Sequence, residues 1–412
     1  MRSLLTLAYL PVSLLLFGHG ADPARAQAPV EQTTPSVPHR NSASAIALSD
    51  ERILIVGGSA YSRTRPVWIP TFRAEIFDIA AERFMPADAT HFYYYEPTLL
   101  TLNDSRVLVA GLHHATEYGD PLSDTYSPEI YDPATNTWSL LDKIVLDNSE
   151  RIYANLLYDG TVFFLAVSYD RLFNSSRKDA NMYRAWLYDS DRETVEEFVP
   201  LLSPRTSAFP VILPSGDVLM TGGYEAVFEP EHLCEQVPAE YAIEAGEPSG
   251  DWCASHGAWM SVPARTTETW DIFWKEKKTY NQLPFDGATE LFTQFLDNGD
   301  VLAVTRVASR LRSQPPRSAA VWSVKGERWA RLQDFPEYFH LDINDDLIEL
   351  DDGMLVGPSG GYVPSTGQWH PFPPSMPTGI IVELPSGTIG FMRASEPYWV
   401  ELDASSPEWT SQ

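Results

Sequence analysis

The feature that most constrains the fold is a spacing of seven residues between two aromatic or large apolar residues, which recurs along the chain. The seven pairs are Phe77/Phe84, Tyr131/Trp138, Tyr188/Val195, Phe273/Tyr280, Trp322/Trp329, Tyr362/Trp369 and Leu402/Trp409. Polar, turn-forming residues separate the two members, as in Asp-Pro-Ala-Thr-Asn-Thr over 132–137. Two short strands joined by a polar turn give this pattern. Seven similar hairpins cannot each hold a separate core, so the spacing predicts a repeat protein whose neighbouring units share one.

A second pattern precedes each pair and consists of a leucine, a tight turn and an apolar strand. The leucines are Leu48, Leu102, Leu157, Leu213, Leu296, Leu350 and Leu384. Asp-Gly, Asn-Gly and Ser-Gly in most of these turns supply the positive φ that a two-residue hairpin needs. Each unit therefore has four antiparallel strands, A to D. Seven such units predict an all-β fold, a seven-bladed β-propeller of four-stranded antiparallel blades over residues 42–412.

Several of these segments are typical of one repeat family. They are Val56-Gly57-Gly58, Thr221-Gly222-Gly223, Tyr131-Asp132-Pro133 with Trp138, and Pro204-Arg205 ahead of a strand A. The chain resembles the kelch repeats of the kelch and galactose-oxidase-like propeller superfamily over residues 42–412. Blades three and five have Ala166-Val167 and Val304-Thr305 where the double glycine is expected, and blades six and seven are short. The resemblance implies a propeller but no single activity, because kelch propellers include enzymes, glycan binders and protein-binding platforms.

The N-terminal segment has the features of an export signal. Arg2 precedes an apolar run from Leu4 to Phe17 that is too short for a membrane span, and Ala24-Arg25-Ala26 fits a cleavage site. We therefore predict a signal peptide over 1–26, a flexible leader over 27–41, and a secreted or periplasmic protein without a membrane span. A retained N-terminal anchor is the alternative.

The charge balance limits the partners. The chain carries 29 basic and 56 acidic residues, a formal net charge of −27. Such a chain is not expected to bind nucleic acid, and we expect a monomer. No phosphate-binding, dinucleotide, zinc-protease or hydrolase motif occurs, so no cofactor is expected and no catalytic residue can be named.

Both cysteines, Cys234 and Cys253, lie in one long insertion over 224–265 of the fourth blade. In an exported protein the pair predicts a disulfide. His232 and His256 stand close to them in the sequence, so a tetrahedral zinc site is the alternative, although the spacing fits no standard zinc finger. We expect the disulfide and no metal.

The long connections join strands B and C, and in a four-stranded meander these leave from the same end as the D–A connections. Arginine and aromatic residues gather in them. The predicted ligand-binding residues are Arg63, Arg65, Trp68, Arg171, Arg177, Arg184, Arg306, Arg310 and Arg312. The planar fork of arginine suits carboxylate, sulfate or phosphate, and aromatic rings beside it stack on sugars. The other interpretation pairs these arginines with neighbouring acidic residues.

Three functions are consistent with these features. We expect non-catalytic recognition of an anionic glycan or a protein on the B–C and D–A loops. One alternative is a carbohydrate-active enzyme acting on an acidic sugar, since a sialic-acid epimerase has a similar kelch scaffold. The other is a structural envelope module. A copper radical oxidase is disfavoured because both cysteines lie inside one insertion. Tyr93-Tyr94-Tyr95-Glu96, ahead of the second blade, is read as an aromatic plug or a ligand platform, and His113-His114 as polar surface.

Overall fold

The structure is a computed structural model. The chain divides into two units, residues 1–30 and 31–412, and all described residues belong to the second. The structure describes residues 40–402 except 63–66, 114–124, 148–149, 169–182, 204, 207, 209, 230–257, 283, 286–290, 297, 306–317, 333–347, 350–353, 358–359, 364–365, 367, 373–379, 387–388 and 393–398. The predicted signal peptide, most of the leader and both cysteines lie outside these residues, and their predictions stay untested.

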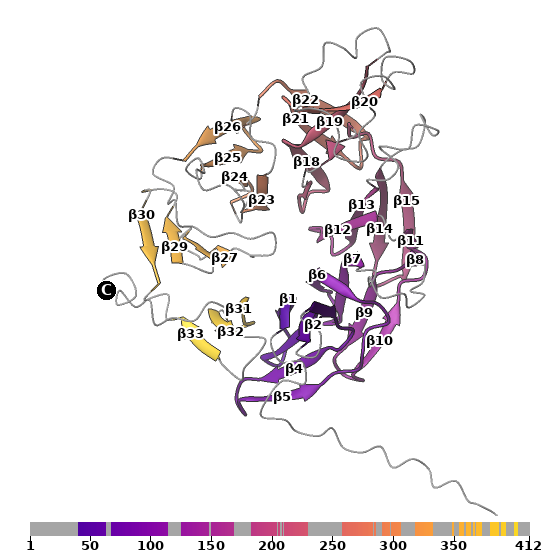
Figure 1. The fold of residues 1–412 in the computed structure, drawn as a ribbon, viewed down its shortest axis with the longest axis vertical. Coiled ribbons are helices and arrows are strands. Elements are labelled where there is room, and N and C mark those ends of the chain that lie inside the picture. Colours follow the sequence, from indigo (N-terminus) through magenta and orange to yellow (C-terminus); the bar gives the residue numbers. More distant parts are fainter. Residues whose placement is uncertain are drawn as a thin grey trace, which may run out of the picture. The chain divides into compact units, whose positions relative to one another are not determined.

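All elements of the described chain are strands, and the first three blades follow the predicted meander (Figure 1). Blade one contains β1 (Arg40–Ala47), β2 (Arg52–Ser62), β4 (Glu75–Asp78) and β5 (Arg83–Pro86), and β3 (Val67–Pro70) pairs with the far end of β2. Blade two contains β6 (Tyr94–Thr101), β7 (Val107–His113), β9 (Glu129–Asp132) and β10 (Thr137–Leu140), beside a two-stranded sheet of β8 (Thr125–Tyr126) and β11 (Leu146–Asp147). Blade three contains β12 (Glu150–Leu156), β13 (Val162–Ser168), β14 (Tyr183–Asp189) and β15 (Thr194–Phe198).

The next three blades repeat this order. Blade four contains β17 (Val211–Ile212), β18 (Asp217–Thr221), β21 (Thr267–Asp271) and β22 (Glu276–Tyr280), with a separate sheet of β16 (Arg205–Thr206), β19 (Tyr224–Glu229) and β20 (Ala258–Pro263). Blade five contains β23 (Leu291–Phe295), β24 (Val301–Thr305), β25 (Ala319–Ser323) and β26 (Arg328–Arg331). Blade six contains β27 (Ile348–Glu349), β28 (Leu355–Gly357), β29 (Gly360–Val363) and β30 (Gln368–Pro371).

The fold is an all-β propeller with antiparallel four-stranded blades, but the described residues form six such blades and not the seven that the repeat count predicted. The residues assigned to a seventh blade form a three-stranded sheet of β31 (Ile380–Glu383), β32 (Ile389–Met392) and β33 (Trp399–Leu402). Trp409, which was to mark the fourth strand there, lies outside the described residues. A sequence spacing predicts hairpins, but it does not decide whether every hairpin completes a four-stranded sheet.

Strand register confirms the seven-residue spacing in five blades and corrects it in the fourth. Phe77 faces Phe84 across β4 and β5, and Trp322 faces Trp329 across β25 and β26. In blade four, by contrast, Phe273 lies in the turn after β21 with 52% of its surface exposed. The buried aromatic residue of that strand is Trp270, which faces Lys277. The error arose because exposed and buried aromatic residues look alike in a sequence.

Apolar clusters join each sheet to the next, and they also close the ring. Blades three and four, for example, share a core in which the apolar residues of β13 meet those of β18. The three-stranded sheet packs on blade six and on blade one. In the latter contact Ile53, Ile55 and Phe77 meet Val382 and Met392. Among the described residues, β1 pairs only with β2 and β33 only with β32, so side-chain packing rather than strand exchange joins the first and last sheets there.

The two kinds of tight turn share one backbone device. A short polar side chain, most often aspartate, accepts backbone N–H groups two or three residues ahead, as Asp104 does from Arg106 and Asp132 does from Ala134. Each turn then needs one residue with positive φ, and glycine provides it only in some blades. The A–B turns use Glu51 (62°), Ser105 (68°), Gly160 (84°), Gly216 (92°) and Gly299 (91°). The C–D turns use Glu82 (49°), Asn136 (55°), Glu193 (52°), Lys275 (56°) and Glu327 (48°).

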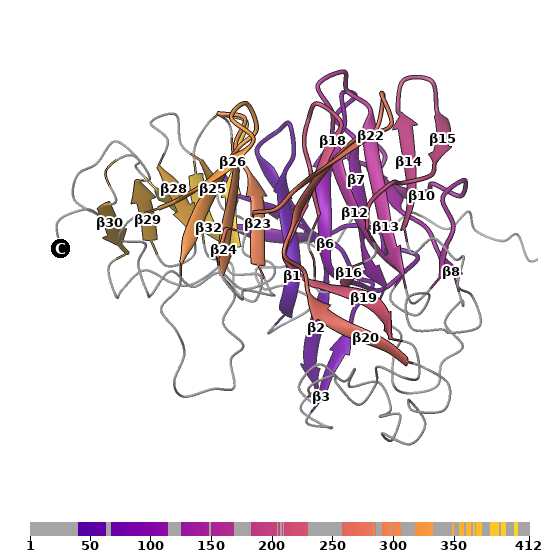
Figure 2. The ribbon, with the colours of Figure 1, turned by 90° about the horizontal axis from the view of Figure 1, so that it is seen from above.

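The two ends of the blades differ in what leaves them (Figure 2). We call the end with the A–B turns (48–52, 102–106, 157–161, 213–217 and 296–300) and the C–D turns the turn face. The opposite end, the loop face, carries the described strand ends 62 and 67, 113 and 125, 168 and 183, 229 and 258, and 305 and 319. Figure 2 shows β3, β19 and β20 extending on this side, away from the turns of blades three and four. All long B–C connections therefore begin and end on the loop face.

The turn face contains two aspartates whose protonation should affect stability in opposite directions. Partial burial raises the pKa of Asp217, with a smaller contribution from Asp271, whereas the backbone N–H of Ala134 lowers the pKa of Asp132. A raised pKa means that ionisation of Asp217 disfavours the fold as the pH rises through the folded value. We expect Asp217→Asn to raise the melting temperature at pH 7, with no gain below the pKa of an unfolded aspartate, about 3.9.

The matched control is Asp132→Asn, which should lower the melting temperature at pH 7 and lose this effect on acidification. Thermal unfolding followed by circular dichroism between pH 3.5 and 8 measures both. A gain for Asp217→Asn that is the same at every pH would contradict the assignment to burial of the charge.

Candidate functional site

The structure describes two of the predicted ligand-binding residues. Trp68 belongs to β3, which pairs with β2 on the loop face, and Arg184 belongs to β14. Arg63, Arg65, Arg171, Arg177, Arg306, Arg310 and Arg312 lie outside the described residues. The strand ends that flank all of them lie on the loop face, so the chain enters and leaves these segments there. Their role in ligand binding stays a prediction.

Arg184 is held by protein groups at the loop-face end of blade three. One of its terminal nitrogens donates to Glu150 at 3.1 Å and to the carbonyl oxygen of Val145 at 3.0 Å. Its guanidinium group also lies 4.6 Å from the ring centre of Trp186. The Glu150 side chain is fully buried, while that of Arg184 is 26% exposed. These contacts correspond to the interpretation in which an arginine pairs with a nearby acid.

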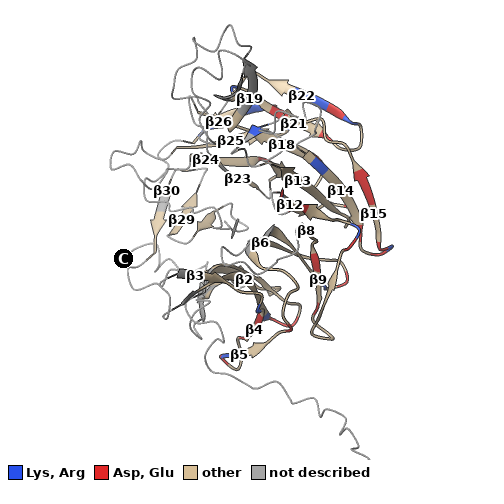
Figure 3. Ribbon diagram, turned by 45° about the vertical axis from the view of Figure 1, so that its right-hand side comes forward, with Lys and Arg blue, Asp and Glu red and all other residues tan. Residues whose placement is uncertain are grey.

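The loop-face ends of four blades each contain a glutamate with at most 2% of its surface exposed. These residues are Glu75, Glu129, Glu150 and Glu268. The arginines Arg73, Arg265 and Arg331 at the same end are exposed. Charged residues also occur on the outer strands, with acidic residues along β15 and lysines on β22 (Figure 3). On the loop face, several glutamates are therefore buried while several arginines are exposed, and Asp147 is an exposed acidic residue there.

Glu129 illustrates how a buried carboxylate organises this face. Its oxygens accept the backbone N–H of His91, at 3.0 Å to each oxygen, and that of Phe92 at 3.2 Å. The Nδ1 atom of His91 lies 2.7 Å from Oε2 of Glu129. Both donors belong to the connection between blades one and two, so Glu129 on β9 fixes that connection against the third strand of the next blade. Glu268 has the same role in blade four, where it accepts the backbone N–H of Ser203 at 2.9 Å.

Two aromatic residues, Phe72 and Tyr93, lie in the two segments that meet next to His91 in the chain. The rings of Phe72 and Tyr93 are 5.4 Å apart in an edge-to-face arrangement, and Phe72 is 44% exposed. Thr90 joins the two segments, because its backbone N–H and its hydroxyl both donate to the carbonyl oxygen of Phe72. Of the predicted Tyr93–Tyr95 cluster, Tyr94 is fully buried and donates to the carbonyl oxygen of Ser127 at 3.0 Å. Burial, and then the nearby Glu129 carboxylate, raise the pKa of Tyr94 well above its ordinary value, so this hydroxyl stays neutral.

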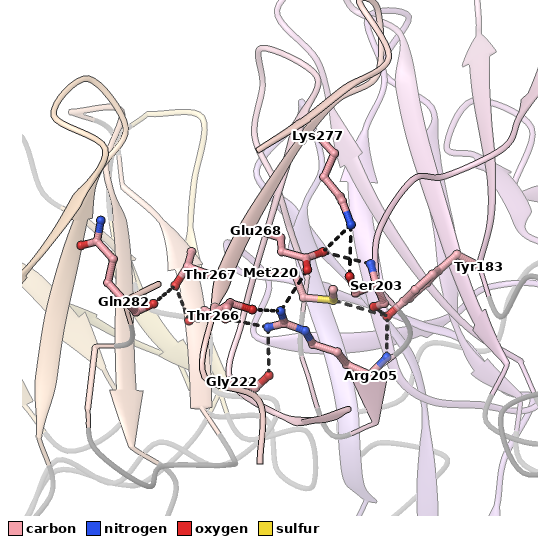
Figure 4. Close-up of polar contacts among 11 residues, drawn as sticks. Tyr183, Ser203, Arg205, Met220, Gly222, Thr266, Thr267, Glu268, Lys277 and Gln282 are labelled. Atoms are coloured by element: carbon pink, nitrogen blue, oxygen red, sulfur yellow. Dashed lines mark hydrogen bonds and ion pairs between the residues drawn. The ribbon is translucent and has the colours of Figure 1, made fainter. Parts of the chain in front are cut away.

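A second polar cluster surrounds Arg205 between blades three and four (Figure 4). The Arg205 side chain has no exposed surface and pairs with Glu268 at 3.2 Å. It also donates to the carbonyl oxygen of Thr266 at 2.7 Å and to that of Gly222 at 3.4 Å. Gly222 precedes β19 and Thr266 follows β20, so one guanidinium group binds both ends of this hairpin extension. The depth of Arg205 makes the cluster structural, because no charge is presented to a ligand.

The site residues His91, Glu129 and Glu268 were not predicted from the sequence. A signal for the carboxylates was present. Glutamate stands two residues before the buried aromatic residue of strand C in blades one, two and four, at Glu75, Glu129 and Glu268. A charged residue repeated at the same position of a buried strand in several blades indicates a contact that recurs within the fold. No sequence signal marks His91, whose role depends on the strand that passes below it.

The fold is a β-propeller whose long connections begin and end at one end of the blades, the loop face. No protein-family model and no curated protein matches the chain. Among solved structures, the chain is similar to a novel fungal alcohol oxidase of the AA5 family in complex with copper, with 11% sequence identity and a TM-score of 0.45. The match covers 78% of this chain and 58% of that chain, so it spans less than two thirds of the oxidase. A likeness at this level carries no argument about activity, and no residue or metal of the oxidase is transferred.

Two further observations concern only the described residues. No helix there has the length and hydropathy needed to cross a membrane. No group of three or more histidine, cysteine, aspartate or glutamate side chains within the described ranges is placed to hold a metal ion.

Proposed function

We propose that the propeller recognises an anionic ligand, a glycan or an acidic protein segment, on its loop face without catalysing a reaction. The observation that carries the proposal is the separation of charge on this face. Glu75, Glu129 and Glu268 are at most 2% exposed, whereas Arg73 and Arg265 are exposed. A protein with a net charge of −27 otherwise repels anions, so a local excess of accessible arginine is needed to hold one.

The framework of the face supports this proposal. The Glu129 and Glu268 carboxylates fix the connections between blades through backbone N–H groups, and the Arg205 cluster fixes both ends of the β19–β20 extension. Loops held on a rigid scaffold lose little conformational freedom on binding. The predicted arginines Arg63, Arg177 and Arg310 belong to connections whose described strand ends lie on the loop face, and they would add to the same charge.

We also propose that the repeats belong to the kelch class and that the protein is exported, is monomeric and contains a Cys234–Cys253 disulfide. Each rests on the sequence patterns given above. The propeller itself is shown by the structure, in which Gly57 and Gly58 lie in the middle of the strand B of blade one, where Gly57 pairs with Ala43.

The proposal is tested with an array of acidic and neutral glycans and with binding measurements at two salt concentrations. We expect acidic glycans alone to bind, and more weakly at high salt. Changing Arg73, Arg265 and Arg331 together to alanine should weaken binding about tenfold, since exposed ion pairs contribute about 0.2–1 kcal/mol each. The control removes the same charge from the turn face by changing Lys275, Lys325 and Arg328 to alanine, and should have little effect. Equal losses in both variants, or turnover of a bound sugar, would overturn the proposal.

A further inference from the structure

We propose that Phe72, His91 and Tyr93 form a subsite for one sugar unit of an acidic glycan, in which His91 accepts a hydrogen bond from a sugar hydroxyl. This inference rests on the proposed function and identifies the part of the loop face that binds the sugar ring. It differs from the charge argument, because none of the three residues is an arginine.

The orientation of the His91 ring follows from the buried Glu129. A carboxylate accepts hydrogen bonds, so the Nδ1 atom of His91 at 2.7 Å from Glu129 must carry the hydrogen. In the neutral ring the lone pair is then on Nε2, on the side of the ring that points away from the buried acid. The His91 side chain is 48% exposed, while that of Glu129 has no exposed surface. The structure therefore presents an oriented hydrogen-bond acceptor at the surface.

Glu129 can hold the His91 imidazole in one orientation because backbone N–H groups hold its own carboxylate in place. Two backbone N–H groups, those of His91 and Phe92, bind its oxygens in addition to the imidazole. The same carboxylate therefore fixes the backbone of residue 91 and the plane of its side chain. A surface histidine without such a partner would rotate freely and lose more entropy on binding.

The neighbouring aromatic rings supply the second part of a sugar subsite. Phe72 is 44% exposed, and its ring meets that of Tyr93 at 5.4 Å. The hydrogen bonds from Thr90 to the carbonyl oxygen of Phe72 hold the segment 71–73 against the segment 90–93. An exposed aromatic face offers the apolar C–H groups of a pyranose a stacking surface. Arg73, next to Phe72 in the chain, is exposed in the same segment and suits the acidic substituent of the sugar.

The test uses the methyl glycosides of glucuronic, galacturonic and N-acetylneuraminic acid, each with its neutral methyl ester, and protein labelled with ¹⁵N in histidine. Comparison with the spectrum of His91→Ala assigns the His91 signals. We expect the free protein to show hydrogen on Nδ1, and at least one acid glycoside to shift the Nε2 signal. Phe72→Ala and His91→Ala should each weaken that binding roughly tenfold. Phe273→Ala, which removes an exposed phenylalanine from the turn face, should leave it unchanged.

Glu129→Gln separates positioning from direct contact. The glutamine side chain can still accept the backbone N–H groups, but its amide N–H₂ would face Nδ1 and favour hydrogen on Nε2. We expect the spectrum to report this exchange of tautomer and binding to fall, while the melting temperature changes less than in Glu129→Ala. A wild-type spectrum with hydrogen on Nε2, or unchanged binding in Glu129→Gln despite the exchange, would overturn the positioning role.

The outcomes distinguish this subsite from the proposed function. If acid and ester bind equally and both depend on Phe72, the sugar subsite stands and anion recognition fails. If acidic glycans bind through Arg73, Arg265 and Arg331 but neither Phe72→Ala nor His91→Ala weakens them, the proposed function stands and the subsite is wrong. If no acid or ester shifts the Nε2 signal of His91 at millimolar concentration, the subsite is also wrong.

Discussion

Replacing Arg205 with methionine is expected to lower the free energy of unfolding by about 3–5 kcal/mol, since removing one member of a buried ion pair leaves the other charge without its partner. The Glu268 carboxylate would keep the backbone N–H of Ser203 and the Lys277 ammonium group at 3.8 Å, but it would lose the guanidinium group at 3.2 Å. The carbonyl oxygens of Gly222 and Thr266 would lose their donor as well. Chemical denaturation measures the loss.

The same variant should loosen the β19–β20 extension, because Arg205 binds the residues at both of its ends. Hydrogen exchange at the amides of 258–263 should rise in Arg205→Met more than exchange in blade two. The double variant Arg205→Met with Glu268→Gln serves as the control, since it removes both charges and should recover part of the stability. A single variant as stable as the wild type, or a double variant less stable than the single one, would show that the ion pair does not hold this region.

Replacing Gly57 with alanine is expected to cost about 2–5 kcal/mol. Gly57 has φ of 72°, which costs an ordinary residue about 1–2 kcal/mol. An added Cβ would also lie 2.6 Å from the carbonyl oxygen of Tyr94, a backbone atom of the next blade. Because neither backbone can move without separating β2 from β6, overpacking adds about 1–3 kcal/mol. Thermal and denaturant unfolding measure the sum.

Gly299→Ala separates the two contributions to this loss. Gly299 also has a positive φ, 91°, but a Cβ built on it meets no atom within 4 Å. The variant should therefore lose only the conformational part, about 1–2 kcal/mol. If Gly57→Ala and Gly299→Ala lose the same stability, the close approach of blades one and two does not require glycine at position 57.

The propeller could be predicted from the sequence because its blades are local structures. The distance from Phe77 to Phe84, or from Trp322 to Trp329, is set by two short strands and one turn, and both pairs face each other as expected. In blade four the seven-residue spacing selected the wrong aromatic residue, because Trp270 is buried and Phe273 is exposed. It also counted a four-stranded seventh blade where the described residues form three strands.

The candidate site was predicted less well, because its residues act across blades. The arginine content of the long connections predicted the loop face as the binding site. Arg184, however, is held by Glu150 and Trp186. The other predicted arginines lie outside the described residues. His91 had no distinguishing neighbour in the sequence. Its partner Glu129 is 38 residues away.

The sequence by itself determined the repeating hairpin, the turn chemistry and the choice of one elaborated face, since each depends on residues only a few positions apart. The tertiary structure alone decided the number of complete blades, the burial of Glu129 and Glu268, and the pairing of Arg205. These depend on which strand passes beside which connection, and a buried charge is acceptable only where that neighbour supplies its hydrogen bonds.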